Sequence, residues 1–185
     1  MIVLSSLPGL TTVKTVQGYE LLFYGDSITE TWRGSTFDVA FAARPAIHAQ
    51  PATADRGHDW YKRSGGGFLL RTLGVLHFLR EENPGAHIVA LAVLPRGWTD
   101  AWHIYDWPSM YKGGIDVINR ALKDFAAQDD AVTYLDCGPA LLPDGKIHPE
   151  FMPDALHPNA DGMELFARCL SPLVDKLMER TNKVH

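Results

Sequence analysis

One apolar run near the middle of the chain constrains the fold more than any other feature of the sequence. His87–Leu94 is almost continuously apolar and follows an amphipathic segment that stops at Asn83-Pro84-Gly85. Such a run is typical of a parallel strand buried on both faces, because the connections between parallel strands place helices over each face of the sheet. Pro95-Arg96-Gly97 ends the run at the predicted carboxyl edge of the sheet. The run therefore predicts an α/β fold.

Short apolar strands alternate with amphipathic helices through the rest of the chain. Parallel strands are predicted at Glu20–Tyr24, His87–Leu94 and Val132–Leu135, with a weak fourth pattern at Ala46–Ala49. Three helical faces are formed by Leu69, Leu73 and Leu76, by Ile115, Ile118, Leu122 and Phe125, and by Met163, Phe166, Leu170, Leu173 and Leu177. This order predicts a single domain over residues 1–185, with a parallel sheet inside three α/β/α layers.

Two segments carry little pattern. Residues 1–19 contain Pro8, Gly9 and Gly18 and are predicted to form an irregular lead-in. Residues 39–67 show no clear periodicity, although a structureless connection of that length is uncommon in a compact domain.

Composition limits the classes of function. The 185 residues carry a net charge of −5 and no basic run, which argues against a nucleic-acid or anionic-membrane surface. No apolar run approaches the roughly 18–20 residues of a membrane span, and Met1–Pro8 lacks the basic leader of a secretion signal. Cys137 and Cys169 lie outside any Cys-x-x-Cys spacing and are expected to be reduced core residues. A cytoplasmic protein is therefore expected.

A serine follows the first of these predicted strands. Leu21–Tyr24 runs into Gly25-Asp26-Ser27, and the polar residues that come next are typical of a helix start. Ser27 is thereby placed at the carboxyl end of a strand, where open α/β sheets bind their ligands. Gly25 permits a sharp turn that would hold the hydroxyl in a cleft. An ordinary helix N-cap explains the same residues when they are taken alone.

An aspartate and a histidine precede the last predicted helix. Asp154 and His157 are three positions apart, so the acid can support the imidazole ring. Alone this spacing is a weak signal, because an aspartate before a helix is often a cap and a loop histidine is often solvated. Together with Ser27, the pair supplies a nucleophile, a general base and an orienting acid.

These motifs resemble a known family. Gly25-Asp26-Ser27 and Asp154-x-x-His157-Pro158 resemble the first and last blocks of the SGNH (GDSL) hydrolases. Leu94-Pro95-Arg96-Gly97 and Met152-Pro153-Asp154 are similar to the catalytic subunits of intracellular platelet-activating-factor acetylhydrolase and their relatives. The resemblance covers about residues 20–37 and 69–178, which is most of the chain.

The resemblance implies a flavodoxin-like fold and hydrolysis of a short acyl ester, of the acetyl type, without a metal or a cofactor. It implies Ser27 as the nucleophile, His157 as the general base and Asp154 as the partner that orients the histidine. The implied binding partner is a small-molecule or lipid ester, and a homodimer is left open.

The resemblance is incomplete at the oxyanion hole. In the family, the oxyanion is bound by the N–H of the serine, by the N–H of a glycine in a second block, and by an asparagine that follows a central strand. Here the backbone N–H of Ser27 is one donor and Gly66, within Gly65–Gly67, is the candidate for the second, but no asparagine follows an apolar strand. Either residues 39–67 replace the strands that the family has in this region, or the sheet lacks the family's central strand. Buried unpaired N–H and C=O groups cost about 1–3 kcal/mol each, so direct pairing of the flanking strands or a substitute strand is expected there.

The missing block leaves two alternatives to an active esterase. One is a catalytically impaired relative that serves as a binding or dimerisation module, and the other is a truncated product with a gap in its sheet. Arg96 is the candidate to hold a negatively charged substrate group, although an arginine at a strand end more often pairs locally. The aromatic segment Thr99–Tyr111 is predicted to be a loop over the sheet edge. His148 lies near the catalytic loop but is expected to lack an acid partner and to be solvated.

Overall fold

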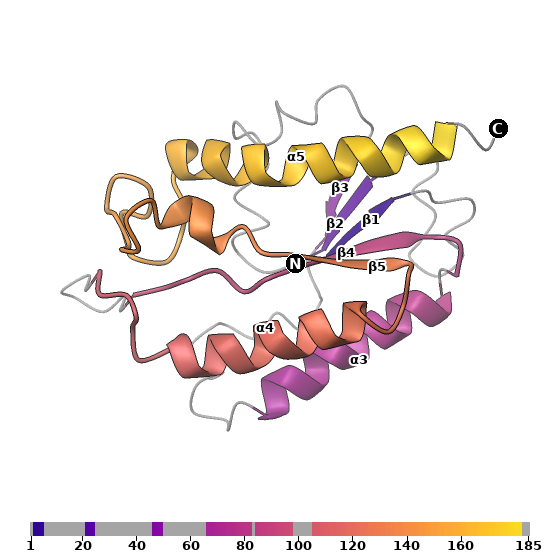
Figure 1. Ribbon diagram of the computed structural model, residues 1–185, viewed down its shortest axis with the longest axis horizontal. Coiled ribbons are helices and arrows are strands. Elements are labelled where there is room, and N and C mark those ends of the chain that lie inside the picture. Colours follow the sequence, from indigo (N-terminus) through magenta and orange to yellow (C-terminus); the bar gives the residue numbers. More distant parts are fainter. Residues whose placement is uncertain are drawn as a thin grey trace.

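A five-stranded sheet forms the centre of the protein (Figure 1). The computed structural model describes residues 2–5, 21–24, 46–49, 66–82, 84–97 and 105–182. The strands lie in the order β3-β2-β1-β4-β5. Their bounds are Ile2–Ser5 for β1, Leu21–Tyr24 for β2, Ala46–Ala49 for β3, His87–Leu91 for β4 and Val132–Leu135 for β5.

Four of the five strands are parallel to one another. β2 pairs in parallel with β3 and β4 with β5, while β1 is antiparallel to both β2 and β4. The three predicted parallel strands are therefore confirmed, although β4 ends at Leu91 rather than at Leu94. The weak pattern at Ala46–Ala49 is a strand at the edge of the sheet.

β1 occupies the central position between β2 and β4. Ile2 pairs with both Tyr24 and Ala90, and Ser5 pairs with both Leu21 and His87. The prediction of an irregular lead-in is wrong for these residues, while the expectation of a substitute strand is confirmed. Without β1, the facing edges of β2 and β4 would lack partners for their backbone N–H and C=O groups. The other residues of the lead-in, and residues 39–45 and 50–65, lie outside the described part of the chain.

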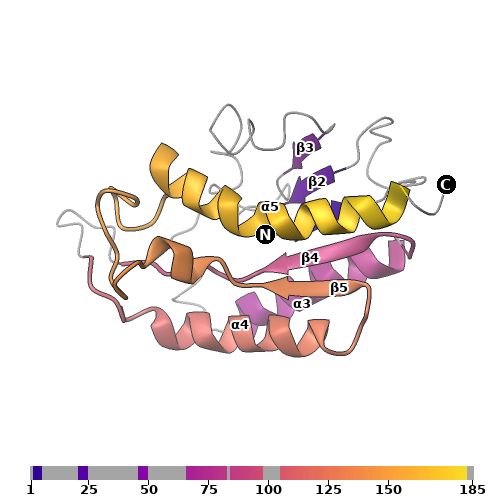
Figure 2. The same ribbon diagram turned by 45° about the horizontal axis from the view of Figure 1, so that its top comes forward.

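Helices cover both faces of the sheet (Figures 1 and 2). α3 (Gly66–Glu82) and α4 (Lys112–Ala126) lie side by side on one face, and α5 (Ala160–Asn182) covers the other. A short 3-10 helix, η1 (Gly138–Leu141), follows β5. The predicted three-layer α/β/α architecture is confirmed. None of the helices within the described ranges combines the length and apolar character that a bilayer crossing requires.

β4 contributes side chains to the core on both faces. Val89 and Leu91 pack in a first core cluster with α5, whereas Ile88 and Ala90 pack in a second core cluster with α3 and α4. Successive side chains of a strand point to opposite faces, so a strand with both faces covered needs apolar residues at every position. The predicted helical faces lie in the same clusters, among them Leu76, Ile118, Leu122, Met163, Phe166 and Leu170.

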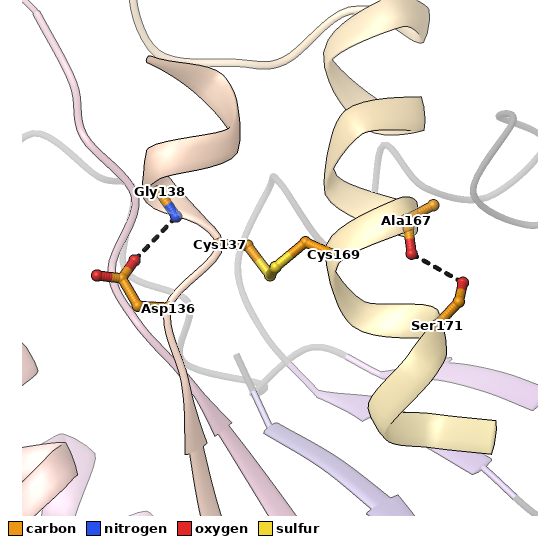
Figure 3. Close-up of a disulfide and its surroundings, with 6 residues drawn as sticks. All are labelled: Asp136, Cys137, Gly138, Ala167, Cys169 and Ser171. Carbon is orange, nitrogen blue, oxygen red and sulfur yellow. Dashed lines mark hydrogen bonds between the residues drawn. A yellow bond between two sulfur atoms is a disulfide. The ribbon is translucent and has the colours of Figure 1, made fainter. Parts of the chain in front are cut away.

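A disulfide joins the end of β5 to α5 (Figure 3). Cys137 directly precedes η1 and is 1% exposed, and its bond to Cys169 holds the two Cα atoms 5.8 Å apart. The prediction of two reduced thiols is therefore wrong. The sequence separation of 32 does not reveal that packing of α5 on the sheet brings these residues within bonding distance.

The central position of β1 predicts the effect of a proline at Val3. Proline lacks the N–H that a central strand needs for its ladder, so Val3→Pro should leave a buried carbonyl unpaired and lower the free energy of unfolding by at least about 1–3 kcal/mol. Val3→Ala, which keeps the backbone donor, is the matched control, and urea unfolding measures both variants. A proline variant as stable as the alanine variant would contradict the central placement of β1.

The disulfide predicts a redox-dependent stability. Replacing Cys137 and Cys169 together by alanine should lower the free energy of unfolding by about 3–4 kcal/mol, because the cross-link restricts a loop of this length in the unfolded chain. Thermal unfolding with and without a reductant tests this. The reductant should lower the melting temperature of the unmodified protein and leave that of the double variant unchanged. Equal melting temperatures for all samples would contradict a stabilising contribution of the disulfide.

Candidate active site

The extension of β4 and the loop before α5 meet at the carboxyl edge of the sheet. β4 continues as an extended segment over residues 92–97, and the N–H of Ala92 donates to the carbonyl of Leu135 at 2.9 Å, which prolongs the pairing of β4 with β5. This segment and the loop before α5 both extend beyond the sheet on the side where β4 and β5 end (Figure 1). Open α/β sheets bind their ligands at this edge.

Asn119 of α4 takes the place of a strand partner at Val93. The N–H of Val93 donates to Oδ1 of Asn119 at 2.7 Å, and Nδ2 of Asn119 donates to the carbonyl of Val93 at 3.1 Å. A carboxamide carries both a donor and an acceptor, so one side chain satisfies both backbone groups just beyond the end of β4. This asparagine therefore supports the strand extension.

The loop between η1 and α5, residues 142–159, contains Asp154 and His157 and is named the histidine loop. It is held in place by its own hydrogen bonds and by the core. Met152 and Ala155 are fully buried in the first core cluster, and the N–H of Met152 donates to the carbonyl of His148 at 2.8 Å. Asn159 closes the loop, because its Nδ2 donates to the carbonyl of Glu150 and its Oδ1 accepts from the N–H of Gly162. Asn159 thereby acts as the N-cap of α5.

Asp154 and His157 form a hydrogen-bonded pair, as predicted from their spacing. Oδ2 of Asp154 lies 2.6 Å from Nδ1 of His157. The other oxygen, Oδ1, accepts the backbone N–H groups of Leu156 at 3.0 Å and His157 at 2.6 Å. With Nδ1 bound to the carboxylate, Nε2 is the ring nitrogen that can accept a proton from a nucleophile. The two side chains are 37% and 35% exposed, so the pair is partly accessible to solvent.

The environment keeps Asp154 ionised. Partial burial by itself raises the pKa of this carboxyl, but the hydrogen bonds from the His157 ring and from the N–H groups of His157 and Leu156 outweigh it. The net result is a pKa of Asp154 below its ordinary value of 3.8. At neutral pH the histidine therefore faces a carboxylate, which favours the tautomer with the proton on Nδ1.

Ala155, between the two members of the pair, has a left-handed backbone. Its φ is +59°, a conformation that costs a residue with a Cβ roughly 1–2 kcal/mol. The surroundings impose it: the methyl group is buried, the N–H donates to the carbonyl of Met152, and the carbonyl accepts the N–H of Gly97 at 2.8 Å. The last of these bonds ties the histidine loop to the extension of β4.

Of the three remaining predicted site residues, the structure describes Gly66 and Arg96 but not Ser27. Gly66 is the first residue of α3, and Arg96 lies directly before Gly97 with its guanidinium carbon 4.6 Å from the centroid of the Tyr111 ring. The carbonyl of Arg96 accepts the hydroxyl of Ser109. Ser27 lies outside the described residues, three positions after the end of β2, so its predicted approach to His157 stays a prediction.

Asp144 and His148 form a second acid–histidine pair, which was not predicted from the sequence. Nε2 of His148 lies 2.7 Å from Oδ1 of Asp144, and the hydrogen bond with this histidine is the main reason why the pKa of Asp144 is lowered. The expectation that His148 has no acid partner is therefore wrong, and the spacing of four residues was the available signal. Within the described parts of the chain, no cluster of three or more His, Cys, Asp or Glu side chains could hold a metal ion.

The sequence profile of the GDSL-like Lipase/Acylhydrolase family matches residues 50–165, more than half of the chain. A search of curated protein sequences finds no significant match.

Solved structures share the fold at low sequence identity. A proposed platelet activating factor from Streptococcus pneumonia is similar with a TM-score of 0.65 and 16% identity, over 82% of each chain. A proposed acylhydrolase from Bacteroides fragilis gives 0.62 and 14%, over 85% of this chain and 86% of the other. A carbohydrate esterase family 3 protein from Talaromyces cellulolyticus gives 0.50 and 19%, over 79% and 69%. These likenesses establish the fold.

The family match adds the chemistry that the fold alone does not give. It spans the β4 extension and the loop with Asp154 and His157, and it supports ester hydrolysis as the general activity. The resemblance to the SGNH (GDSL) hydrolases is confirmed, and the chain belongs to the GDSL-like Lipase/Acylhydrolase family.

Proposed function

We propose that this protein is a serine hydrolase that cleaves a short, acetyl-type acyl ester through an acyl-enzyme. The observation that carries the proposal is the Asp154–His157 pair, in which the carboxylate binds Nδ1, so that Nε2 is the ring nitrogen that can act as a base. Ser27 is the proposed nucleophile, since it follows β2, and β2 is parallel to β4 because both are antiparallel to β1. Parallel strands end at the same edge, which is also the edge of the histidine loop.

The reaction proceeds in two steps. Nε2 of His157 takes the proton of the Ser27 hydroxyl as the oxygen attacks the ester carbonyl, and it then gives this proton to the departing alkoxide, so that an alcohol leaves. A water molecule next loses a proton to the same Nε2 and attacks the acyl-enzyme. The bond to Ser27 breaks, the serine oxygen regains the proton, and the carboxylic acid is released. Asp154 holds the ring and stabilises the imidazolium formed in each step.

The oxyanion is proposed to bind the backbone N–H of Ser27 and that of Gly66. Gly66 begins α3, and the first N–H groups of a helix have no intrahelical acceptor and lie at its positive end. Because α3 precedes β4 and is linked to it by the short turn at Pro84-Gly85, its N-terminus is directed toward the carboxyl edge of the sheet. Both features support Gly66 as the second donor.

The orientation of β1 supports low activity as the alternative. The asparagine donor of the family follows a central strand at the carboxyl edge, but the central β1 runs in the opposite direction, so its own carboxyl end lies at the other edge. Loss of one oxyanion donor costs about 10²–10³ in rate. A catalytically impaired protein that acts as a binding or dimerisation module is therefore the second candidate.

The substrate class, the assembly and the cellular location are also proposals. A small-molecule or lipid ester is proposed as the substrate, with Arg96 holding a negatively charged group of it, and a homodimer is proposed for the assembly. The cytoplasmic location stays a prediction. The Cys137–Cys169 disulfide weighs against it, because disulfides persist mainly in oxidising compartments.

Turnover of p-nitrophenyl acetate tests the nucleophile and the oxyanion hole. We expect Ser27-dependent hydrolysis at a rate about 10²–10³ below the 1–10³ s⁻¹ that is usual for enzymes, since no asparagine of the sequence follows an apolar strand as the family's third donor does. Ser27→Ala should abolish the activity. A purified protein whose hydrolysis is equal in the alanine variant would refute the serine mechanism, and a turnover within the usual range would mean that a third donor exists.

Asp154→Asn tests the acid partner. The kcat should fall by roughly 10²–10⁴, because the amide disfavours the required tautomer and leaves the imidazolium unsupported. Stability should respond to pH as well. The folded-state pKa of Asp154 is depressed, so its contribution is present above the ordinary value of 3.8 and is lost as the pH falls through the lower folded value.

Melting temperatures of the unmodified protein and of Asp154→Asn, recorded between about pH 7 and pH 3, measure this pH dependence of stability. The unmodified protein should be the more stable at pH 7, and the difference should shrink toward pH 3. A difference that does not change with pH would contradict an ionised, hydrogen-bonded Asp154.

A further inference from the structure

Tyr105 links the segment before α4 to the residue in front of Asp154. Its ring packs against the first core cluster, and its hydroxyl donates a hydrogen bond to the carbonyl of Pro153 with 2.5 Å between the two oxygens. The two residues are 48 positions apart, so this bond is a tertiary contact between separate segments. The segment of Tyr105 is itself tied to the β4 extension, because the hydroxyl of Ser109 donates to the carbonyl of Arg96.

Asp154 is thereby held from both sides. Pro153 precedes it and accepts from Tyr105, while Ala155 follows it and accepts from the N–H of Gly97. The pyrrolidine ring of Pro153 also fixes one of the two backbone torsions of that residue. Both carbonyls that flank the acid are thus bound by segments outside the histidine loop, which limits how far the Cα atom of Asp154 can shift or rotate.

The alignment of Asp154 with His157 depends on this restraint. Oδ2 of Asp154 must stay within 2.6 Å of Nδ1 while Oδ1 remains bound to two backbone N–H groups. Ala155 has a left-handed backbone, and this strained conformation persists only while the surrounding contacts hold it in place. Misplacement of a catalytic group by about 1 Å can cost 10²-fold in rate, so a lost restraint beside the acid has a kinetic consequence.

We propose that Tyr105 is a positioning residue for the Asp154–His157 pair, acting through the carbonyl of Pro153 and not on the substrate. Its kinetic consequence rests on the proposed function, but the alignment of the pair does not require that the protein turn over any ester. The hydroxyl–carbonyl bond is exposed, so water replaces part of it when the hydroxyl is removed. The expected loss in kcat for Tyr105→Phe is therefore about 3- to 10-fold, with KM unchanged.

Tyr134→Phe is the matched control. Tyr134 lies in β5 and packs against the second core cluster, on the face of the sheet opposite to the histidine loop. This substitution also removes one phenolic hydroxyl from a partly buried tyrosine, but it leaves both carbonyls beside Asp154 bound. The three proteins are compared by kcat and KM on p-nitrophenyl acetate and by thermal unfolding.

Proton NMR of histidine-labelled protein reports on the pair without any turnover. The proton between Nδ1 of His157 and Asp154 is followed at neutral pH and is identified by its loss in Asp154→Asn. Its exchange with water measures how well the pair stays closed, so this readout remains valid if the protein proves to be inactive. A failure of the proposed function and a failure of this inference are thereby distinguishable.

The outcomes separate positioning from a general structural role. The proposal is supported if the His157 proton exchanges faster in Tyr105→Phe than in Tyr134→Phe at a temperature where both variants are folded. A lower kcat with constant KM in Tyr105→Phe supports the kinetic consequence. Exchange equal to that of the control overturns it, and so does a Tyr105→Phe variant that loses thermal stability while its exchange and kcat match the control.

Discussion

The backbone of β4 has to be paired on both edges, and this requirement shapes the rest of the sheet. β4 packs against helices on both of its faces, so water cannot satisfy its N–H and C=O groups. β5 pairs with one edge, and β1 pairs with the other. β1 also pairs with β2, so one short strand from the start of the chain connects the two parallel halves into a single sheet.

The same pairing sets the conditions for the chemistry. β2, β4 and β5 keep their common direction, and the acid–histidine loop is tied to the extension of β4 by the Gly97–Ala155 hydrogen bond. The carboxyl end of the antiparallel β1, however, lies at the opposite edge. The described part of the chain therefore shows a well-formed Asp154–His157 pair, whereas the rate of catalysis also depends on the donors that bind the oxyanion, so the family assignment and the rate of catalysis are separate questions.

The histidine loop is stabilised from several directions. Asn159 caps α5 directly after the loop, and Met152 and Ala155 anchor it in the core. The disulfide fixes α5 to the end of β5, which leaves the start of that helix little freedom to move relative to the sheet. Gly162 is part of this arrangement, because a Cβ there would lie 2.5 Å from the carbonyl oxygen of Phe151. The placement of this loop thus depends on contacts with α5, with the first core cluster and with the extension of β4.

The sequence by itself determined the features that depend on local pattern. The continuous apolar run identified β4, the helical periodicities identified the buried faces of α4 and α5, and a spacing of three identified the Asp154–His157 pair. Only the tertiary structure decided the central place of β1, the Cys137–Cys169 disulfide and the bond from Tyr105 to Pro153. Each of these joins segments that are distant along the chain. Their approach is set by how the layers pack, and neither periodicity nor residue spacing records that packing.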